Sequence, residues 1–266
     1  MFISLCKVIR LFICGALVLF CSSCVTEITK NGKPYVKTDK IVNKIDAAKD
    51  YAELAAGYLK QGNKEGALRS INKGLAINPD SPEIINILAL YYESDGEYKL
   101  ADNEFNKAIS ADKSYTATYM NYGGFLYRLE KFQQACDMLK KASSDVLYDR
   151  RADAFNNLGL CLKRIDKTKE AEEAFNRSLG HDFRNPKALI ELSLINFDRG
   201  DFIKSQQYYD EYLKYGPQSP RTLWLGIRLA HIADDQDKKS SYGLFLKNQF
   251  PDSKECGEYI SWLKTR

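Results

Sequence analysis

Residues 116–142 have the sequence TATYMNYGGFLYRLEKFQQACDMLKKA. Apolar residues recur at helical spacing on both sides of a polar break at Glu130, which predicts two short helices joined by a tight turn. Small residues stand among large ones, so the two backbones are expected to approach closely while the large side chains fill the space around them. The large residues are Tyr119, Tyr122, Leu126 and Leu139, and the small ones are Gly123, Ala135 and Ala142.

The same pattern recurs along the chain. The small residue of the second helix returns at spacings of 34, 34, 36 and 34 residues, at Ala67, Ala101, Ala135, Ala171 and Ser205. A period of 34 residues is typical of the tetratricopeptide repeat, a helix-turn-helix unit. Each such hairpin leaves one apolar face open and buries it by stacking on the next hairpin. The predicted fold is therefore all-α, a right-handed α-solenoid of about six tetratricopeptide (TPR) repeats.

The predicted repeats form a superhelical domain over residues 46–266. They lie near residues 48–81, 82–115, 116–151, 152–185, 186–219 and 220–253. The turn between the two helices is expected at the same place in each repeat, at Gly62, Gly96, Glu130, Asp166, Gly200 and Asp234. The sixth repeat has Lys239 where the others have a small residue, a departure expected of a terminal repeat that caps the stack.

The first residues differ from the rest of the chain. Residues 1–23 carry two basic residues, no acidic residue and a nearly continuous apolar run over residues 11–21. This run is shorter than the roughly 20 apolar residues of a transmembrane helix, so we predict a secretory signal peptide. The small residues before Cys24 resemble a bacterial lipobox, which predicts lipidation at Cys24, with a plain N-terminal anchor and ordinary cleavage as alternatives. Residues 24–45 are polar and lysine-rich and are expected to form a solvated tether without helical spacing.

The remainder has the composition of folded protein, since the 266 residues are 44% hydrophobic and 28% charged. Removing residues 1–23 takes away two of the 39 basic residues and none of the 35 acidic ones, so the mature charge is 37 minus 35, or +2. That balance implies no nucleic acid partner. Only Cys136, Cys161 and Cys256 remain, too few for a disulfide scaffold. Cys136 falls on the second helix of repeat three and Cys161 on the first helix of repeat four, and a disulfide and two buried thiols both remain open.

The sequence offers little chemistry. Its two histidines, His181 and His231, lie in different repeats, and neither is near a cysteine or carboxylate at metal-ligand spacing. The glycines of residues 62–66 belong to the turn of the first repeat and not to a phosphate loop. We therefore expect no catalytic residue, no metal and no cofactor, and we predict that the chain is not an enzyme.

The remaining candidate for a function is a surface that binds another protein. In tetratricopeptide proteins the first helix of each hairpin lines a concave groove, and this resemblance selects a set of partner-binding residues. The set is Asn86, Leu90, Met120, Gly124, Tyr127, Asn156, Leu160, Lys163, Ile190, Leu194 and Phe197. It is more apolar than a solvated face requires, which suits an extended peptide or a helix as ligand. For each residue the alternative is packing against the neighbouring hairpin.

Four segments are more specific than the repeat alone. They are residues 121–126 (NYGGFL), 156–161 (NNLGLC), 200–202 (GDF) and 250–253 (FPDS). In this order they closely resemble the PilF/PilW family of type IV pilus biogenesis lipoproteins, which carry six such repeats behind a lipobox.

The resemblance implies a pilotin, a lipid-anchored protein on the periplasmic face of the outer membrane. Such a protein helps the secretin subunit reach that membrane and multimerise, which supports pilus assembly and twitching motility. Val25 is not the aspartate that commonly retains lipoproteins at the inner membrane, so outer-membrane placement is expected. The alternative is a periplasmic TPR lipoprotein that scaffolds another cell-envelope assembly machine.

Overall fold

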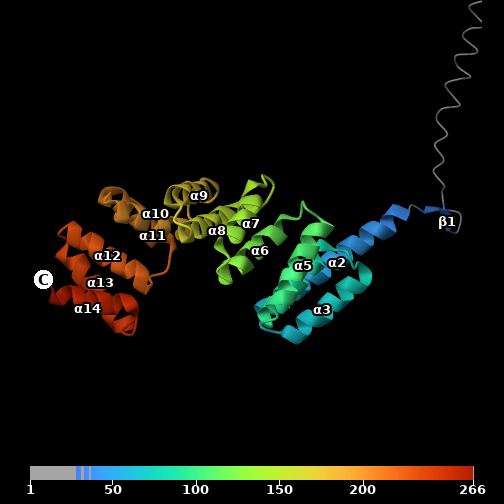
Figure 1. Cartoon of the computed structure of the whole chain (residues 1–266), viewed down its shortest axis with the longest axis horizontal. Helices are drawn as coiled ribbons and strands as arrows, with labels where there is room; N and C mark the ends of the chain where they lie inside the picture. The colour runs from blue at the N-terminus through green and yellow to red at the C-terminus, as the bar shows by residue number, and fades with distance from the viewer. Residues whose placement is uncertain (1–27, 31–32, 36, 266) are drawn as a thin grey trace, which may run out of the picture.

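The computed structural model describes residues 28–30, 33–35 and 37–265, and this part of the chain is built from thirteen helices and one small hairpin. The strands are β1 (Ile28–Lys30) and β2 (Lys33–Tyr35). The helices are α2 (Lys37–Lys60), α3 (Lys64–Ile77), α4 (Pro82–Ser94), α5 (Tyr98–Ala111), α6 (Thr116–Arg128), α7 (Phe132–Ser144), α8 (Arg151–Arg164), α9 (Thr168–His181), α10 (Pro186–Arg199), α11 (Phe202–Tyr215), α12 (Pro220–Ile232), α13 (Gln236–Gln249) and α14 (Lys254–Lys264). Consecutive helices form hairpins that follow one another in an elongated array from α2 to α14 (Figure 1). The all-α repeat fold predicted from the 34-residue period is confirmed.

Close helix packing explains the small residues of the repeat. A Cβ atom on Gly123 of α6 would lie 2.6 Å from the Cγ atom of Leu139 on α7, so only glycine allows this approach. Ala135 on α7 is fully buried in the same contact region. The large side chains of successive hairpins, among them Phe105 and Phe175, merge into one core that runs through the middle of the array. Each hairpin thus buries its apolar face against its neighbours.

The six predicted turns share one backbone conformation. Gly62, Gly96 and Gly200 have φ angles of 73°, 81° and 85°, and Glu130, Asp166 and Asp234 have φ angles of 59°, 60° and 56°. This left-handed region is easy for glycine and costs an L-residue roughly 1–2 kcal/mol. The turn positions predicted from the sequence are therefore confirmed, and three of them carry local strain.

Two parts of the described chain differ from the prediction. Helix α2 already begins at Lys37, so the prediction of a non-helical tether up to residue 45 is wrong for residues 37–45. Ile45 is 48% exposed, which shows why helical apolar spacing is absent there: the helix extends beyond the packed core into solvent. Adding residues to an existing helix is much easier than nucleating one, so a polar extension needs no buried stripe. The second difference lies upstream, also within the predicted tether. There β1 and β2 pair antiparallel with Thr29 opposite Pro34.

The chain ends in a helix outside the six repeats. Ser253 caps the start of α14 by accepting a hydrogen bond from the backbone N–H of Cys256. Cys256 and Tyr259 are buried against Leu223 and Leu246 of the sixth hairpin. Helix α14 therefore covers the apolar face that the last hairpin would otherwise leave open.

The predicted signal peptide and Cys24 lie outside the described residues. Within residues 28–30, 33–35 and 37–265, no helix has the length and apolar character needed to cross a membrane.

Candidate functional site

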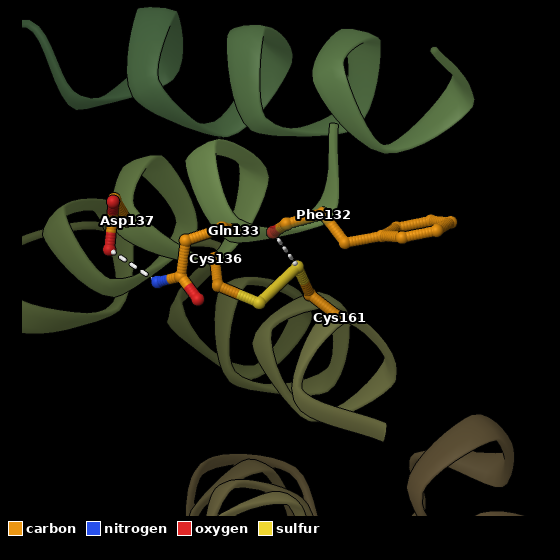
Figure 2. The surroundings of a disulfide bond; sticks show 5 residues. All are labelled: Phe132, Gln133, Cys136, Asp137 and Cys161. Atoms are coloured by element: carbon orange, nitrogen blue, oxygen red, sulfur yellow. Dashed lines mark hydrogen bonds between the residues drawn. A yellow bond between two sulfur atoms is a disulfide. The ribbon is translucent and has the colours of Figure 1, made fainter. Parts of the chain in front are cut away.

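A disulfide joins the third and fourth repeats. Cys136 on α7 and Cys161 on α8 are bonded with their Cα atoms 5.5 Å apart, as Figure 2 shows. The Cys161 sulfur also lies 3.0 Å from the carbonyl oxygen of Phe132 at the start of α7. The sequence left a bridge and two thiols open, and the structure contains the bridge, whereas Cys256 is a free buried thiol. The bond ties the second helix of one hairpin to the first helix of the next.

A pocket opens beside this bridge, where repeats three and four meet. Its volume is about 160 Å³, and its lining is Gly124, Tyr127, Arg128, Leu139, Asn157 and Leu160. Three of these, Gly124, Tyr127 and Leu160, belong to the predicted groove. The walls are mainly apolar, and an amide and a guanidinium group are present. Such a pocket suits one apolar side chain of a bound peptide. The peptide backbone, or a polar side chain next to the inserted one, would then contact the polar groups at the rim.

Aromatic and charged contacts hold the pocket wall in place. The Tyr127 ring meets the Phe132 ring edge to face at 5.3 Å, and the Arg164 guanidinium lies 4.3 Å from the centroid of Phe132. Arg128 is oriented by Glu93 of the preceding repeat, whose Oε1 accepts from Nε at 2.6 Å. These contacts join α4, α6 and α8, so the first helices of repeats two to four share one continuous surface. A wall made of preoriented side chains loses little entropy on binding.

Five predicted groove residues are buried instead of lining the surface. They are Asn86, Met120, Asn156, Ile190 and Leu194, none of which is more than 7% exposed. Two of them accept a hydrogen bond from the next hairpin: Asn121 donates to Asn86 at 3.2 Å, and Asn157 donates to the sulfur of Met120 at 3.8 Å. A buried side chain has no surface to offer a partner, so for these five the alternative of packing between hairpins is the observed one.

Lys163 was also predicted to face a partner, but the structure pairs it with a buried carboxylate. Glu191 on α10 is 3% exposed, and its Oε2 accepts from Lys163 Nζ at 2.6 Å. Arg221 on α12 approaches both oxygens of the same carboxylate, at 2.5 and 3.1 Å. This network therefore connects the first helices of repeats four, five and six.

The charge of Glu191 depends on these two partners. Burial alone would raise the pKa of Glu191, but the hydrogen bonds from Arg221 and Lys163 outweigh it and hold the pKa below its ordinary value. Glu191 occupies the position that Asn121 and Asn157 fill in earlier repeats. An acidic residue at that place, with basic residues on the flanking first helices, was the sequence signal for this network.

Leu90 and Phe197 complete the predicted set and are half-buried. Leu90 lines a shallow cavity with Tyr98 and Arg128, adjacent to the pocket of repeats three and four. Phe197 lies near the C-terminal end, where Arg228 of α12 stacks on its ring. Applying the same groove positions to the sixth repeat would have selected Trp224 and Arg228, which the sequence-based set omitted.

The two histidines take part in aromatic packing. His181 stacks on Phe155 with ring centroids 5.7 Å apart, and His231 meets Trp262 edge to face at 5.0 Å. In the part of the chain that the structure describes, no three His, Cys, Asp or Glu side chains gather in a way that could hold a metal ion.

Comparison with known proteins agrees with this architecture. Residues 82–115 and 115–181 match the tetratricopeptide repeat family. The chain is 37% identical over 238 residues to the type IV pilus assembly protein PilF of Pseudomonas aeruginosa, which covers 90% of this chain and 92% of PilF.

Solved structures give the same result. The structure of Pseudomonas aeruginosa PilF superposes with a TM-score of 0.79 at 36% identity, covering 82% of this chain and 99% of that one. The structure of PilW, a widely conserved type IV pilus biogenesis factor, superposes with a TM-score of 0.68 at 24% identity, covering 80% of this chain and 98% of that one. At that identity the likeness to PilW concerns the fold.

Proposed function

Because this chain belongs to the PilF/PilW family of type IV pilus biogenesis proteins, we propose that it is a pilotin. In this proposal it is a non-enzymatic scaffold, anchored by a lipid on the periplasmic face of the outer membrane. It binds the secretin subunit of the pilus machine and assists its localisation and multimerisation, which supports pilus biogenesis and twitching motility.

The observation that carries this proposal is the pocket between repeats three and four. It is mainly apolar, it has a polar rim, and it lies on the surface shared by the first helices. A segment of the partner can place one apolar side chain in the pocket while its backbone follows the surface. No bond is made or broken, so the protein acts by holding the partner segment.

The lipid at Cys24 would supply membrane affinity. One acyl chain gives only marginal membrane binding, so a lipoprotein with several chains is anchored far more firmly. Binding the partner on a membrane-anchored scaffold then raises the effective concentration of that partner at the membrane. The alternative function, a periplasmic TPR lipoprotein serving another envelope machine, needs the same anchor and groove and differs in the partner. Co-purification with a secretin separates the two.

The test is a Tyr127→Ala/Leu160→Ala double variant. Truncating two side chains that line the pocket should weaken binding to purified secretin fragments by about 2 kcal/mol or more, roughly 30-fold. Secretin multimers in cells should fall in parallel, and circular dichroism should show a folded protein, because both side chains are half-buried and not in the fully buried core.

The matched control is Tyr215→Ala/Leu244→Ala. These residues are exposed on second helices, at 41% and 59%, and should leave secretin binding unchanged. A folded Tyr127→Ala/Leu160→Ala protein that binds secretin as well as the unmodified chain would place the site elsewhere.

A further inference from the structure

Both tryptophans of the chain lie at the C-terminal end of the groove surface. Trp224 on α12 and Trp262 on α14 meet edge to face with ring centroids 5.8 Å apart. Arg228 lies one helical turn after Trp224, so the two side chains share a face of α12. The Arg228 guanidinium is 5.3 Å from the Trp224 centroid and 4.3 Å from the centroid of Phe197 on α10. The first helices α10 and α12 and the terminal helix α14 thus form one cluster of aromatic rings around a cation.

Arg228 is not neutralised within this cluster. Its Nε atom is buried and has no hydrogen-bond partner within residues 28–30, 33–35 and 37–265. Asp198 and Glu258 are near enough to favour the charged form, but among the described residues neither forms an ion pair with Arg228. Burial acts the other way, as the largest influence, and lowers the pKa of Arg228. The guanidinium is therefore a partly desolvated cation that lacks a close carboxylate.

Arg221 on the same helix provides an internal comparison. It lies two turns before Arg228 and directs both terminal nitrogens at the two oxygens of Glu191. A planar guanidinium with its faces against aromatic rings presents its N–H groups at the edge, which is the geometry that a carboxylate matches. The same helix face therefore holds Arg221, which is paired with the Glu191 carboxylate, and Arg228, for which no described residue provides a paired carboxylate.

We propose that the cluster of Phe197, Trp224 and Arg228 is a binding site for an acidic peptide segment of another protein. A glutamate or aspartate side chain pairs with Arg228, and an adjacent apolar side chain packs on Trp224. Residues of these types carry a large share of the energy in protein interfaces, and a partly buried charged hydrogen bond is stronger than one in water. This site is separate from the pocket of repeats three and four and does not depend on the identity of the partner bound there.

The two tryptophans make the proposal directly measurable, because all tryptophan emission of the chain comes from Trp224 in this cluster and from Trp262, which packs against Trp224. The full chain is titrated with the end-blocked peptide SLEELSG and with its glutamine counterpart SLQQLSG, which keeps shape and loses charge. The glutamate peptide should change the emission and bind at least about tenfold more tightly than the glutamine peptide. Added salt should weaken binding of the glutamate peptide alone. Equal affinities, or no change in emission with either peptide, would overturn the proposal, and this comparison needs no variant.

Variants then locate the site. Arg228→Gln should abolish the difference between the two peptides, and Arg228→Lys should restore it in part because the charge returns without the planar fork. Arg177→Gln is the matched control, since Arg177 of α9, the second helix of repeat four, also lies over an aromatic ring, 4.1 Å from the centroid of Phe155. It should leave the titration unchanged. The Tyr127→Ala/Leu160→Ala protein should also keep the full preference for the glutamate peptide, so failure of this proposal and failure of the pilotin proposal are distinguishable. A preference that persists in folded Arg228→Gln would place the acidic site elsewhere.

Discussion

Cys136 and Cys161 cross-link helices α7 and α8 with their Cα atoms 5.5 Å apart, beside the pocket wall formed by Leu139 and Leu160. Each cysteine is within one helical turn of one of these pocket residues. The bond therefore fixes the distance between two hairpins at the place where the proposed partner binds.

Loss of this disulfide should destabilise the protein. The bond closes a loop with a sequence separation of 25 residues, for which the chain-entropy relation gives about 3.5 kcal/mol. Cys136→Ser/Cys161→Ser should therefore lower the urea midpoint and the melting temperature clearly. Adding a reductant should destabilise the unmodified chain in the same way and have no effect on the double variant. A reductant effect of equal size in both proteins would contradict the assignment.

The same glycine substitution should have opposite effects at two positions. Gly200→Ala should destabilise by about 1 kcal/mol, because the residue has φ of 85° and no neighbour within 4 Å that a methyl group could contact. Gly57→Ala lies inside α2, also in open space, and should stabilise by about 1 kcal/mol through helix propensity. Denaturant unfolding of both variants checks the signs, and a shift in the same direction for both would be inconsistent with the turn geometry.

Ala135 should not tolerate a larger side chain. It is fully buried where α7 meets α6, so Ala135→Leu overpacks the contact and should destabilise by about 1 to 3 kcal/mol. Gln134 is adjacent and exposed, and Gln134→Leu should change the melting temperature little. Equal effects of the two substitutions would show that the helix register is wrong.

Stability should depend on pH through Glu191. Its folded-state pKa lies below the ordinary value of 4.5, so the ionised carboxylate stabilises the fold above pH 4.5, and this contribution is lost as the pH falls through the folded pKa. Glu191→Gln should destabilise by about 2 kcal/mol at neutral pH and should show a smaller loss of stability between neutral and acid pH. Glu173→Gln removes an exposed carboxylate and serves as the control. Parallel urea-midpoint curves for Glu191→Gln and the unmodified chain would disprove this role.

Lipidation at Cys24 is checked by metabolic labelling with palmitate. The unmodified protein should be labelled and should fractionate with membranes, whereas Cys24→Ser should be unlabelled, because the cysteine is the acceptor. Cys256→Ser controls for the general effect of removing a thiol, since Cys256 is buried and distant in sequence. Label that persists in Cys24→Ser would rule out this acceptor.

The sequence by itself determined the repeat, its period and its turns. These features are local. Gly123 packs on Leu139 of the same hairpin, and the left-handed turn at Glu130 is set by the backbone conformation of that residue and its neighbours in the chain. Spacing along the chain reports such short-range packing directly. The resemblance to tetratricopeptide proteins, and not the spacing, selected Gly124, Tyr127 and Leu160, which the structure brings together in one pocket.

Only the tertiary structure decided how the hairpins meet. The rotation between neighbouring hairpins buries Met120 while leaving Tyr127 half-exposed, and it brings Cys136 to Cys161 and Arg221 to Glu191. A 34-residue period leaves that rotation open, because the same hairpin can stack at several angles. The physical reason is that contacts between hairpins join residues far apart in sequence, and their geometry depends on how all the side chains of both faces fill the shared space.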